Sequence, residues 1–220
     1  MNGTSRERHE AIVIGGGQGG LSASHYLAKR GIDHVVLDAG DRIGHQWRSR
    51  YDSLRLYSPA RYDGLPGMAF PLPPNAFPTG NQMADYLESY AAHFDLPVRT
   101  SIGVDGLRRT DGGDGYLVTA GDQEFEAPQV VIAAGFFREP YVPPFANDLA
   151  SSIRQLHSSD YRRPSQLADG PVLVVGLSHS GADLAMEAVQ SGHPTIICGK
   201  GHGQSRSRWT AAGAGWPGRC

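Results

Sequence analysis

Three glycines near the N-terminus, Gly15, Gly17 and Gly20, have the spacing of a loop that binds nucleotide phosphates. They follow the short apolar run AIVIGG and open the segment LSASHYLAKRG, whose apolar and small residues recur at helical spacing. In such a GxGxxG turn the first glycine permits the tight turn. The second lets the backbone approach a pyrophosphate, and the third lets helix and strand pack closely. Because a helix N-terminus also favours phosphate charge, the pattern predicts a dinucleotide site.

An acidic residue, Asp38, ends the next apolar segment, HVVLDAG, 18 residues beyond Gly20. A carboxylate at the tip of this second strand can accept hydrogen bonds from ribose hydroxyls. With Asp38 in place, a dinucleotide-binding β-α-β unit explains the glycines better than a glycine-rich turn in some other α/β sheet.

A second glycine turn contains Gly176, Ser178, Ser180 and Gly181, and it also lies between an apolar run, PVLVVG, and a helical segment. One interpretation is a second dinucleotide site, weakened because Ser178 replaces the glycine that admits the pyrophosphate. The serine hydroxyl can still donate a hydrogen bond to phosphate. Lys200, just after the strand TIIC, is placed to contact a 2′-phosphate, which favours NADPH over NADH.

The remote alternative for this second turn is the nucleophile elbow of a serine hydrolase, with Ser178 as the nucleophile. The elbow has glycine two residues after its serine, where this chain has Ser180. The acid and the histidine should also follow in chain order, and the residues after Ser178 leave little room for them. We therefore expect a nucleotide site here.

The segments around these turns predict alternating strands and helices. Residues 11–38 read as one β-α-β unit. Residues 41–80 hold six prolines and many apolar side chains, which is typical of a lid or wall rather than a linker. Thr79 is expected to cap a helix over 81–94. Short strands are expected near 98, 103–109, 116–120 and 124–127, followed by a buried strand from Gln129.

The composition excludes several classes of protein. The chain has 220 residues, 40% of them hydrophobic and 19% charged, with a formal net charge of −2, so it lacks the basic surface of a nucleic-acid binder. No apolar run approaches the roughly 20 residues of a membrane helix. Cys198 and Cys220 form neither a disulfide framework nor a Cys-x-x-Cys pair, and the histidines show no metal-ligand pattern. We expect a cytoplasmic protein with no metal, nucleic-acid or membrane partner.

Five blocks, between about residues 10 and 200, together resemble the flavin-containing monooxygenase family of two-dinucleotide-domain flavoproteins. They are DAGDRIGHQWRSRYDSLRLYSPARYDGLP, FPTGNQMADYLESYAAHFDLPVR, VVIAAGFFREPYVPP, QLHSSDYR and PVLVVGLSHSGADLAMEA. Their order and spacing carry the resemblance. It departs from the family at Tyr57, where animal members have asparagine, so no catalytic residue is assigned.

The resemblance implies a set of cofactor contacts. FAD would lie on Gly15, Gly17, Gln18, Gly20 and Asp38, with Gln46 and Trp47 beside the flavin, Val104 at the adenine, and Ala134 and Gly135 at a nearby strand end. NADPH would lie on Gly176, Ser178, Ser180, Gly181 and Lys200.

The same resemblance implies a fold and a reaction. The fold is α/β, a three-layer FAD/NAD(P)-binding, Rossmann-like fold with an antiparallel β-meander and an incomplete second dinucleotide-binding domain. NADPH would reduce FAD, and a flavin hydroperoxide would pass one oxygen atom of O₂ to a small organic substrate. The alternative is a truncated, inactive flavin-binding fragment.

The expected domains are an FAD-binding part at 1–144, a connecting segment at 145–170 and the start of an NAD(P)H-binding domain at 171–200. Residues 201–220 are expected to form an irregular tail, either a basic interaction segment or an out-of-frame end. The abrupt change of composition there favours the out-of-frame end.

Overall fold

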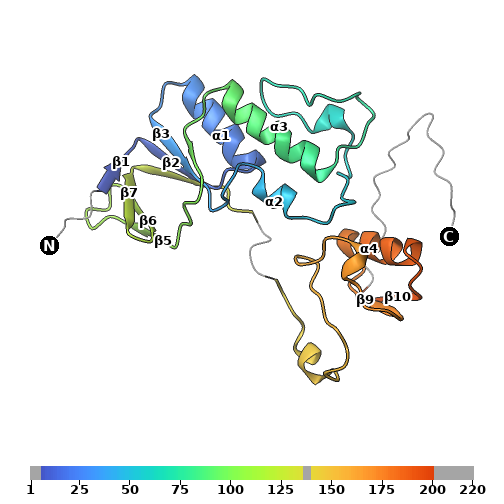
Figure 1. Cartoon of the computed structure of the whole chain (residues 1–220). Coiled ribbons are helices and arrows are strands. Elements are labelled where there is room, and N and C mark those ends of the chain that lie inside the picture. Colours follow the sequence, from blue (N-terminus) through green and yellow to red (C-terminus); the bar gives the residue numbers. More distant parts are fainter. Residues whose placement is uncertain (1–5, 136–139, 201–220) are drawn as a thin grey trace. The chain divides into compact units, whose positions relative to one another are not determined.

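The structure is a computed structural model that describes residues 6–135 and 140–200 (Figure 1). By its internal contacts the chain divides into a first unit that ends at Arg163 and a second that begins at Pro164. The predicted tail at 201–220 lies outside the described residues. Each unit is considered by itself, and the domain boundaries expected from the sequence stay predictions.

A parallel sheet forms the centre of the first unit, with strand order β4-β3-β2-β8. Its strands are β2 (Ala11–Ile14), β3 (His34–Leu37), β4 (Val98–Arg99) and β8 (Gln129–Ile132). Every residue of β2 and β3 is buried, which explains why both read as unbroken apolar runs. The predicted β-α-β unit is therefore present, with its carboxyl strand ends at one edge.

A β-meander covers one face of this sheet. It consists of β5 (Gly106–Arg109), β6 (Tyr116–Ala120) and β7 (Gln123–Ala127) in antiparallel order, with β1 (Arg6–Arg8) added parallel to β7. Alternate residues of β6 and β7, such as Val118 and Phe125, pack on Ile12 and Val35 of the parallel sheet.

Helices form the third layer (Figure 1). They are α1 (Gln18–Lys29), the short α2 (His45–Arg48) and α3 (Gly80–His93). Thr79 caps α3 as the sequence predicts, and it forms a capping box with Gln82. The helical stripe of α3, including Met83 and Leu87, packs with Leu21 of α1 in one core. The predicted three-layer fold with a meander is confirmed.

Two buried tyrosines of α3 hold the proline-rich loop in place. The Tyr86 hydroxyl donates to the Met68 carbonyl at 2.7 Å and accepts from the Leu65 amide at 2.6 Å. The Tyr90 hydroxyl donates to the Pro66 carbonyl at 2.7 Å, and burial raises the pKa of Tyr90 to about 12. Prolines have no backbone N–H to donate. The tyrosine hydroxyls of α3 therefore supply hydrogen-bond partners for the backbone of this loop.

Removing the Tyr86 hydroxyl is expected to loosen this loop. Tyr86→Phe leaves the Leu65 amide and the Met68 carbonyl without this partner, at a cost of about 1–3 kcal/mol. For a chain of this size that corresponds to a fall in Tm of roughly 2–12 °C. Tyr90→Phe removes a single bond and should lower Tm less. Equal melting temperatures for wild type and both variants would contradict the assignment.

The sequence prediction for the strand from Gln129 is wrong in one respect. It was expected to be buried, yet the Ile132 side chain is 68% exposed. Ile132 is exposed because β8 is the last strand of the parallel sheet. Within the described residues, β8 pairs with β2 alone. An apolar run therefore identified the strand correctly but not its place at an edge.

The second unit contains the second strand-turn-helix. After a 3₁₀ turn at Pro164–Gln166 come β9 (Val172–Val175), α4 (His179–Gln190) and β10 (Thr195–Cys198), with β9 and β10 paired in parallel. Two further 3₁₀ turns, Ala60–Tyr62 and Pro144–Asp148, belong to the first unit. Among residues 6–135 and 140–200, no helix has both the length and the apolar character of a bilayer-spanning segment.

Candidate functional site

In the first glycine turn, two glycines are required by the fold and a third leaves space for a ligand. A Cβ atom on Gly20 would lie 1.8 Å from the Gly15 carbonyl oxygen, and one on Gly15 would lie 2.4 Å from the Ala133 oxygen. Gly15 also has φ +105°, which favours glycine. By contrast, a Cβ on Gly17 meets no protein atom within 4 Å, and its φ of −83° suits any residue. The space in front of Gly17 is therefore left open by the protein and fits a phosphate at the α1 N-terminus.

Asp38 lies beside this turn, and its carboxylate is bound to backbone. Oδ2 accepts from the Gly16 amide at 2.6 Å, and Oδ1 accepts from the Gly40 amide at 2.8 Å. The sequence predicts a carboxylate at the strand tip that accepts from ribose, and the half-buried Asp38 also shapes the loop itself. A carboxylate has about four lone-pair positions, so Asp38 can still accept hydrogen bonds from ribose hydroxyls.

Three other predicted contacts of the first unit follow neighbouring strand ends: Val104, Ala134 and Gly135. The loop after β4 is tied to Asp38, because the Ile102 amide donates to the Asp38 carbonyl at 2.8 Å, and half-buried Val104 follows in that loop. Beyond β8, the Ala133 amide donates to the Ile14 carbonyl, and a Cβ on Gly15 would lie 3.2 Å from the Ala134 Cα. Ala134 therefore lies beside the glycine turn, and Gly135 follows it. Gly135 has φ +72°. Ligands of open α/β sheets bind at such converging carboxyl ends.

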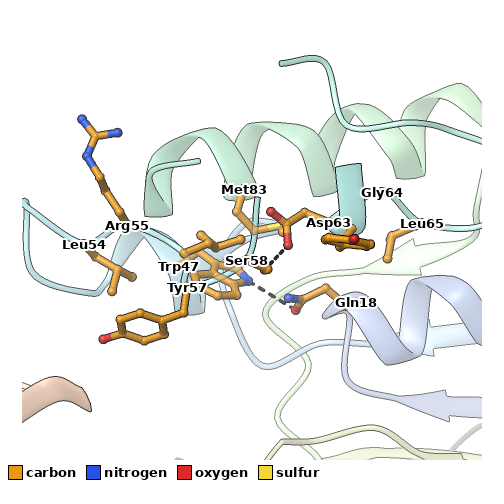
Figure 2. Close-up of a pocket in the computed structure, with 12 residues that line it drawn as sticks. Gln18, Trp47, Leu54, Arg55, Tyr57, Ser58, Asp63, Gly64, Leu65 and Met83 are labelled. Atoms are coloured by element: carbon orange, nitrogen blue, oxygen red, sulfur yellow. Dashed lines mark hydrogen bonds between the residues drawn. The ribbon is translucent and has the colours of Figure 1, made fainter. Parts of the chain in front are cut away.

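Trp47 and Gln18 meet, whereas Gln46 stands apart. The Trp47 indole N–H donates to Gln18 Oε1 at 3.3 Å, which joins α2 to the first residue of α1 (Figure 2). Gly44, the N-cap of α2, has φ +80°, and a Cβ there would lie 2.7 Å from the Ala84 Cα. This close approach fixes α2 on α3. Gln46 is exposed and does not line the cavity described next.

A cavity of about 430 Å³ opens beside Gln18 and Trp47 (Figure 2). Its walls are mostly apolar and come from α2, α3 and the proline-rich loop. They comprise Gln18, Trp47, Leu54, Arg55, Leu56, Tyr57, Ser58, Tyr62, Asp63, Gly64, Leu65 and Met83. Residues 41–80, which were expected to form a lid or wall, thus supply much of the wall of this cavity. A mostly apolar cavity with a few polar groups is typical of small-molecule and cofactor sites.

Asp63 is a cavity residue that sequence reasoning missed. The Ser58 hydroxyl donates to its Oδ1, while its Oδ2 is shielded from solvent and has no hydrogen-bond partner among the described residues. Burial raises the pKa of the Asp63 carboxyl, and the bond from Ser58 opposes this in part. The available signal was an acidic residue within LYSPARYDGLPGM, a stretch rich in aromatic, proline and aliphatic residues.

Asp63→Asn is expected to stabilise the protein at neutral pH. Because burial raises the pKa of Asp63 above its unfolded value, an ionised Asp63 costs folding free energy above that raised pKa. The cost disappears below the ordinary aspartate pKa of about 3.9. The amide keeps an acceptor for Ser58, so a higher Tm than that of the wild type is expected at pH 7–8. The gain should shrink steadily toward pH 4.

Thermal melts across this pH range measure the gain, and Asp52→Asn is the matched control. Asp52 lies in the same loop, is exposed and is 3.5 Å from Arg163. A gain in Asp63→Asn that is independent of pH, or one that Asp52→Asn reproduces, would contradict a buried charge at Asp63.

The second unit repeats the geometry of the first glycine turn. Gly176 has φ +129°, and a Cβ on Gly181 would lie 1.9 Å from the Gly176 oxygen. Ser178 takes the place of Gly17, with nearly the same backbone angles, φ −85° and ψ 179°. The Gly176 amide donates to the Cys198 carbonyl at the end of β10, which places exposed Lys200 two residues beyond this contact. Ser180 lies in the first turn of α4 and is exposed.

The backbone at Ser178 bears on the hydrolase alternative. A nucleophile elbow holds its serine in a sharp, strained turn. Ser178 instead has ordinary extended angles as the N-cap of α4, and the positive φ lies at Gly176. The turn therefore matches a nucleotide-binding turn and gives no support to a hydrolase.

Known proteins match this chain in sequence and in fold. The family model described as pyridine nucleotide-disulphide oxidoreductase matches residues 12–212. An oxidoreductase named CzcO-like from Geobacillus kaustophilus is 43% identical over 178 residues, which cover 81% of this chain and 51% of that protein. A probable indole-3-pyruvate monooxygenase of Arabidopsis thaliana, YUCCA1, is 32% identical over 83% of this chain and 45% of its own length.

A solved structure agrees with these sequence matches. The flavin-containing monooxygenase of Stenotrophomonas maltophilia superposes with a TM-score of 0.80 and 31% identity, covering 89% of this chain and 59% of that chain. The chain spans about half the length of the curated relatives it matches. These findings confirm the resemblance to flavin monooxygenases, and the chain belongs to the pyridine nucleotide-disulphide oxidoreductase family of enzymes.

Proposed function

We propose that the first unit binds FAD and the second binds NADPH, as parts of a flavin-dependent monooxygenase that acts on a small molecule and O₂. The observation that carries the proposal is the open space at Gly17, which lies next to Asp38 and the Trp47 cavity. The relatives named as monooxygenases support it.

The residues of the first unit fit FAD by their chemistry. Amides of the first turn of a helix have no intrahelical acceptor, so those of α1 suit the pyrophosphate, and Asp38 suits a ribose. Gln18 and Trp47 form one wall of the cavity and would orient the flavin or its substrate. When bound, the cofactor supplies electron transfer from NADPH and reaction with O₂. The apolar walls, such as Leu54 and Met83, exclude water from that chemistry.

Lys200 is assigned to the 2′-phosphate that distinguishes NADPH from NADH. Its removal in Lys200→Ala should weaken NADPH binding about tenfold, the effect of one charged hydrogen bond, and leave NADH binding unchanged. Calorimetric titration with both nucleotides measures this. The control is Lys29→Ala, which removes the other lysine of the chain, exposed at the end of α1. An equal loss for both nucleotides would contradict the assignment.

The proposal as a whole is tested by adding NADPH, without oxygen, to protein that has been reconstituted with FAD. Loss of the oxidised flavin absorbance, followed by oxygen uptake on exposure to air, is the expected result. Bound flavin that NADPH does not reduce would instead favour a flavin-binding chain without activity.

A further inference from the structure

We propose that Asp63 selects substrates that carry a protonated amine, by acting as the counter-ion for that group within the Trp47 cavity. This assignment rests on the proposed function, because it names the substrate class of the same site. Asp63 is the one carboxylate among the residues that line the cavity.

The Asp63 carboxylate is under-bonded. It accepts a hydrogen bond from Ser58, and Oδ2, in a solvent-shielded position, has no partner in the part of the chain that the structure describes. A buried carboxylate with an unused acceptor is costly unless it meets a donor or a cation. Asp63 also lines the cavity, so a donor or a cation bound there lies beside this carboxylate.

Within the described residues, no ion pair to Asp63 is found. Arg55 is the one cationic side chain that lines the cavity, and its guanidinium donates to the Phe77 carbonyl at 3.2 Å. Figure 2 shows the Arg55 side chain directed away from Asp63. Among the described residues, the Asp63 carboxylate is therefore not paired with the arginine that lines the same cavity.

The remaining walls suit the same ligand. Trp47, Tyr57 and Tyr62 line the cavity, and aromatic rings attract ammonium groups. Leu54, Leu65 and Met83 accept the apolar remainder of a small molecule. A short apolar molecule with an ammonium group meets both features, whereas a neutral hydrocarbon meets only the second.

Two sulfides of equal length separate the ammonium from the rest of the ligand. The probes are 2-(methylthio)ethylamine, protonated at pH 7, and methyl propyl sulfide, in which a methyl group replaces the ammonium. Each has the same thioether and an S-methyl signal that NMR can follow during titration of FAD-saturated protein. We expect the amine to bind at least about tenfold more tightly, as for one charged hydrogen bond.

The variants locate that preference. Asp63→Asn should bind both sulfides equally, while Ser58→Ala, which keeps the charge, should retain the preference. Asp52→Asn repeats the charge removal at an exposed site of the same loop and should bind as wild type does. Equal affinities in wild type, or an unchanged preference in Asp63→Asn, would overturn the proposal.

The same samples report on the proposed function independently. Retained flavin absorbance measures whether FAD binds, whatever the two sulfides do. If no flavin is retained, the proposed function fails, and an amine preference in the flavin-free protein still supports the role of Asp63. An amine preference that vanishes on saturation with FAD would mean that the flavin itself covers Asp63, which overturns substrate selection by this residue.

Discussion

Gly17→Ala is expected to abolish FAD binding while leaving the folded apoprotein intact. The new Cβ meets no protein atom within 4 Å, and the φ of −83° is suitable for alanine, so Tm should not fall. The methyl group instead occupies the space assigned to the pyrophosphate and separates it from the backbone amides. Loss of two charged hydrogen bonds corresponds to an affinity at least about 100-fold lower.

Gly20→Ala provides the contrasting control for this prediction. Its Cβ would lie 1.8 Å from the Gly15 oxygen, so the turn itself must distort. We expect a loss of at least about 2 kcal/mol, or roughly 4–8 °C in Tm, before any ligand is added. Titration with FAD and thermal melts of both apoproteins separate the two cases. Stoichiometric FAD in a folded Gly17→Ala protein would refute the assignment of that space.

Asp38→Ala is expected to lower both FAD affinity and stability. The variant loses the acceptor for ribose, which is worth about 1.5–3 kcal/mol, or roughly 10- to 100-fold in affinity. The amides of Gly16 and Gly40 also lose their acceptor, so Tm should fall as well.

Asp105→Ala is the matched control for Asp38→Ala, because Asp105 has similar bonds at another place. Its carboxylate accepts from the Thr119 hydroxyl at 2.6 Å and the Gly121 amide at 2.8 Å, in the meander. This control should lose some stability and keep wild-type FAD affinity. If both variants bind FAD equally well, Asp38 is a structural residue only.

The parts of the fold that local rules govern were predictable from the sequence. Backbone atoms approach Gly15 and Gly20 so closely that no side chain fits at either position. The two glycines therefore recur at a fixed spacing that can be recognised in a sequence. Thr79 and the helical stripe of α3 follow from capping and periodicity. The edge position of β8 was not predictable, because an apolar run does not report how many neighbours a strand has.

The cavity could not be predicted for a different reason. Residues 41–79 have little regular structure, so no periodicity indicates which side chains point inward. The loop takes its shape from long-range bonds, such as those from Tyr86 and Tyr90 to its backbone. These place Ser58 and Asp63 beside Trp47. Only the three-dimensional arrangement shows that Oδ2 of Asp63 has no partner among residues 6–135 and 140–200.

The central claim, that the first unit binds FAD, is tested most directly by a visible absorption spectrum. The protein is incubated with FAD, freed of unbound cofactor by gel filtration and scanned beside Gly17→Ala treated identically. The wild type should show the two bands of oxidised flavin at one FAD per chain, and the variant should show none. A colourless wild-type protein that is folded by circular dichroism would contradict it.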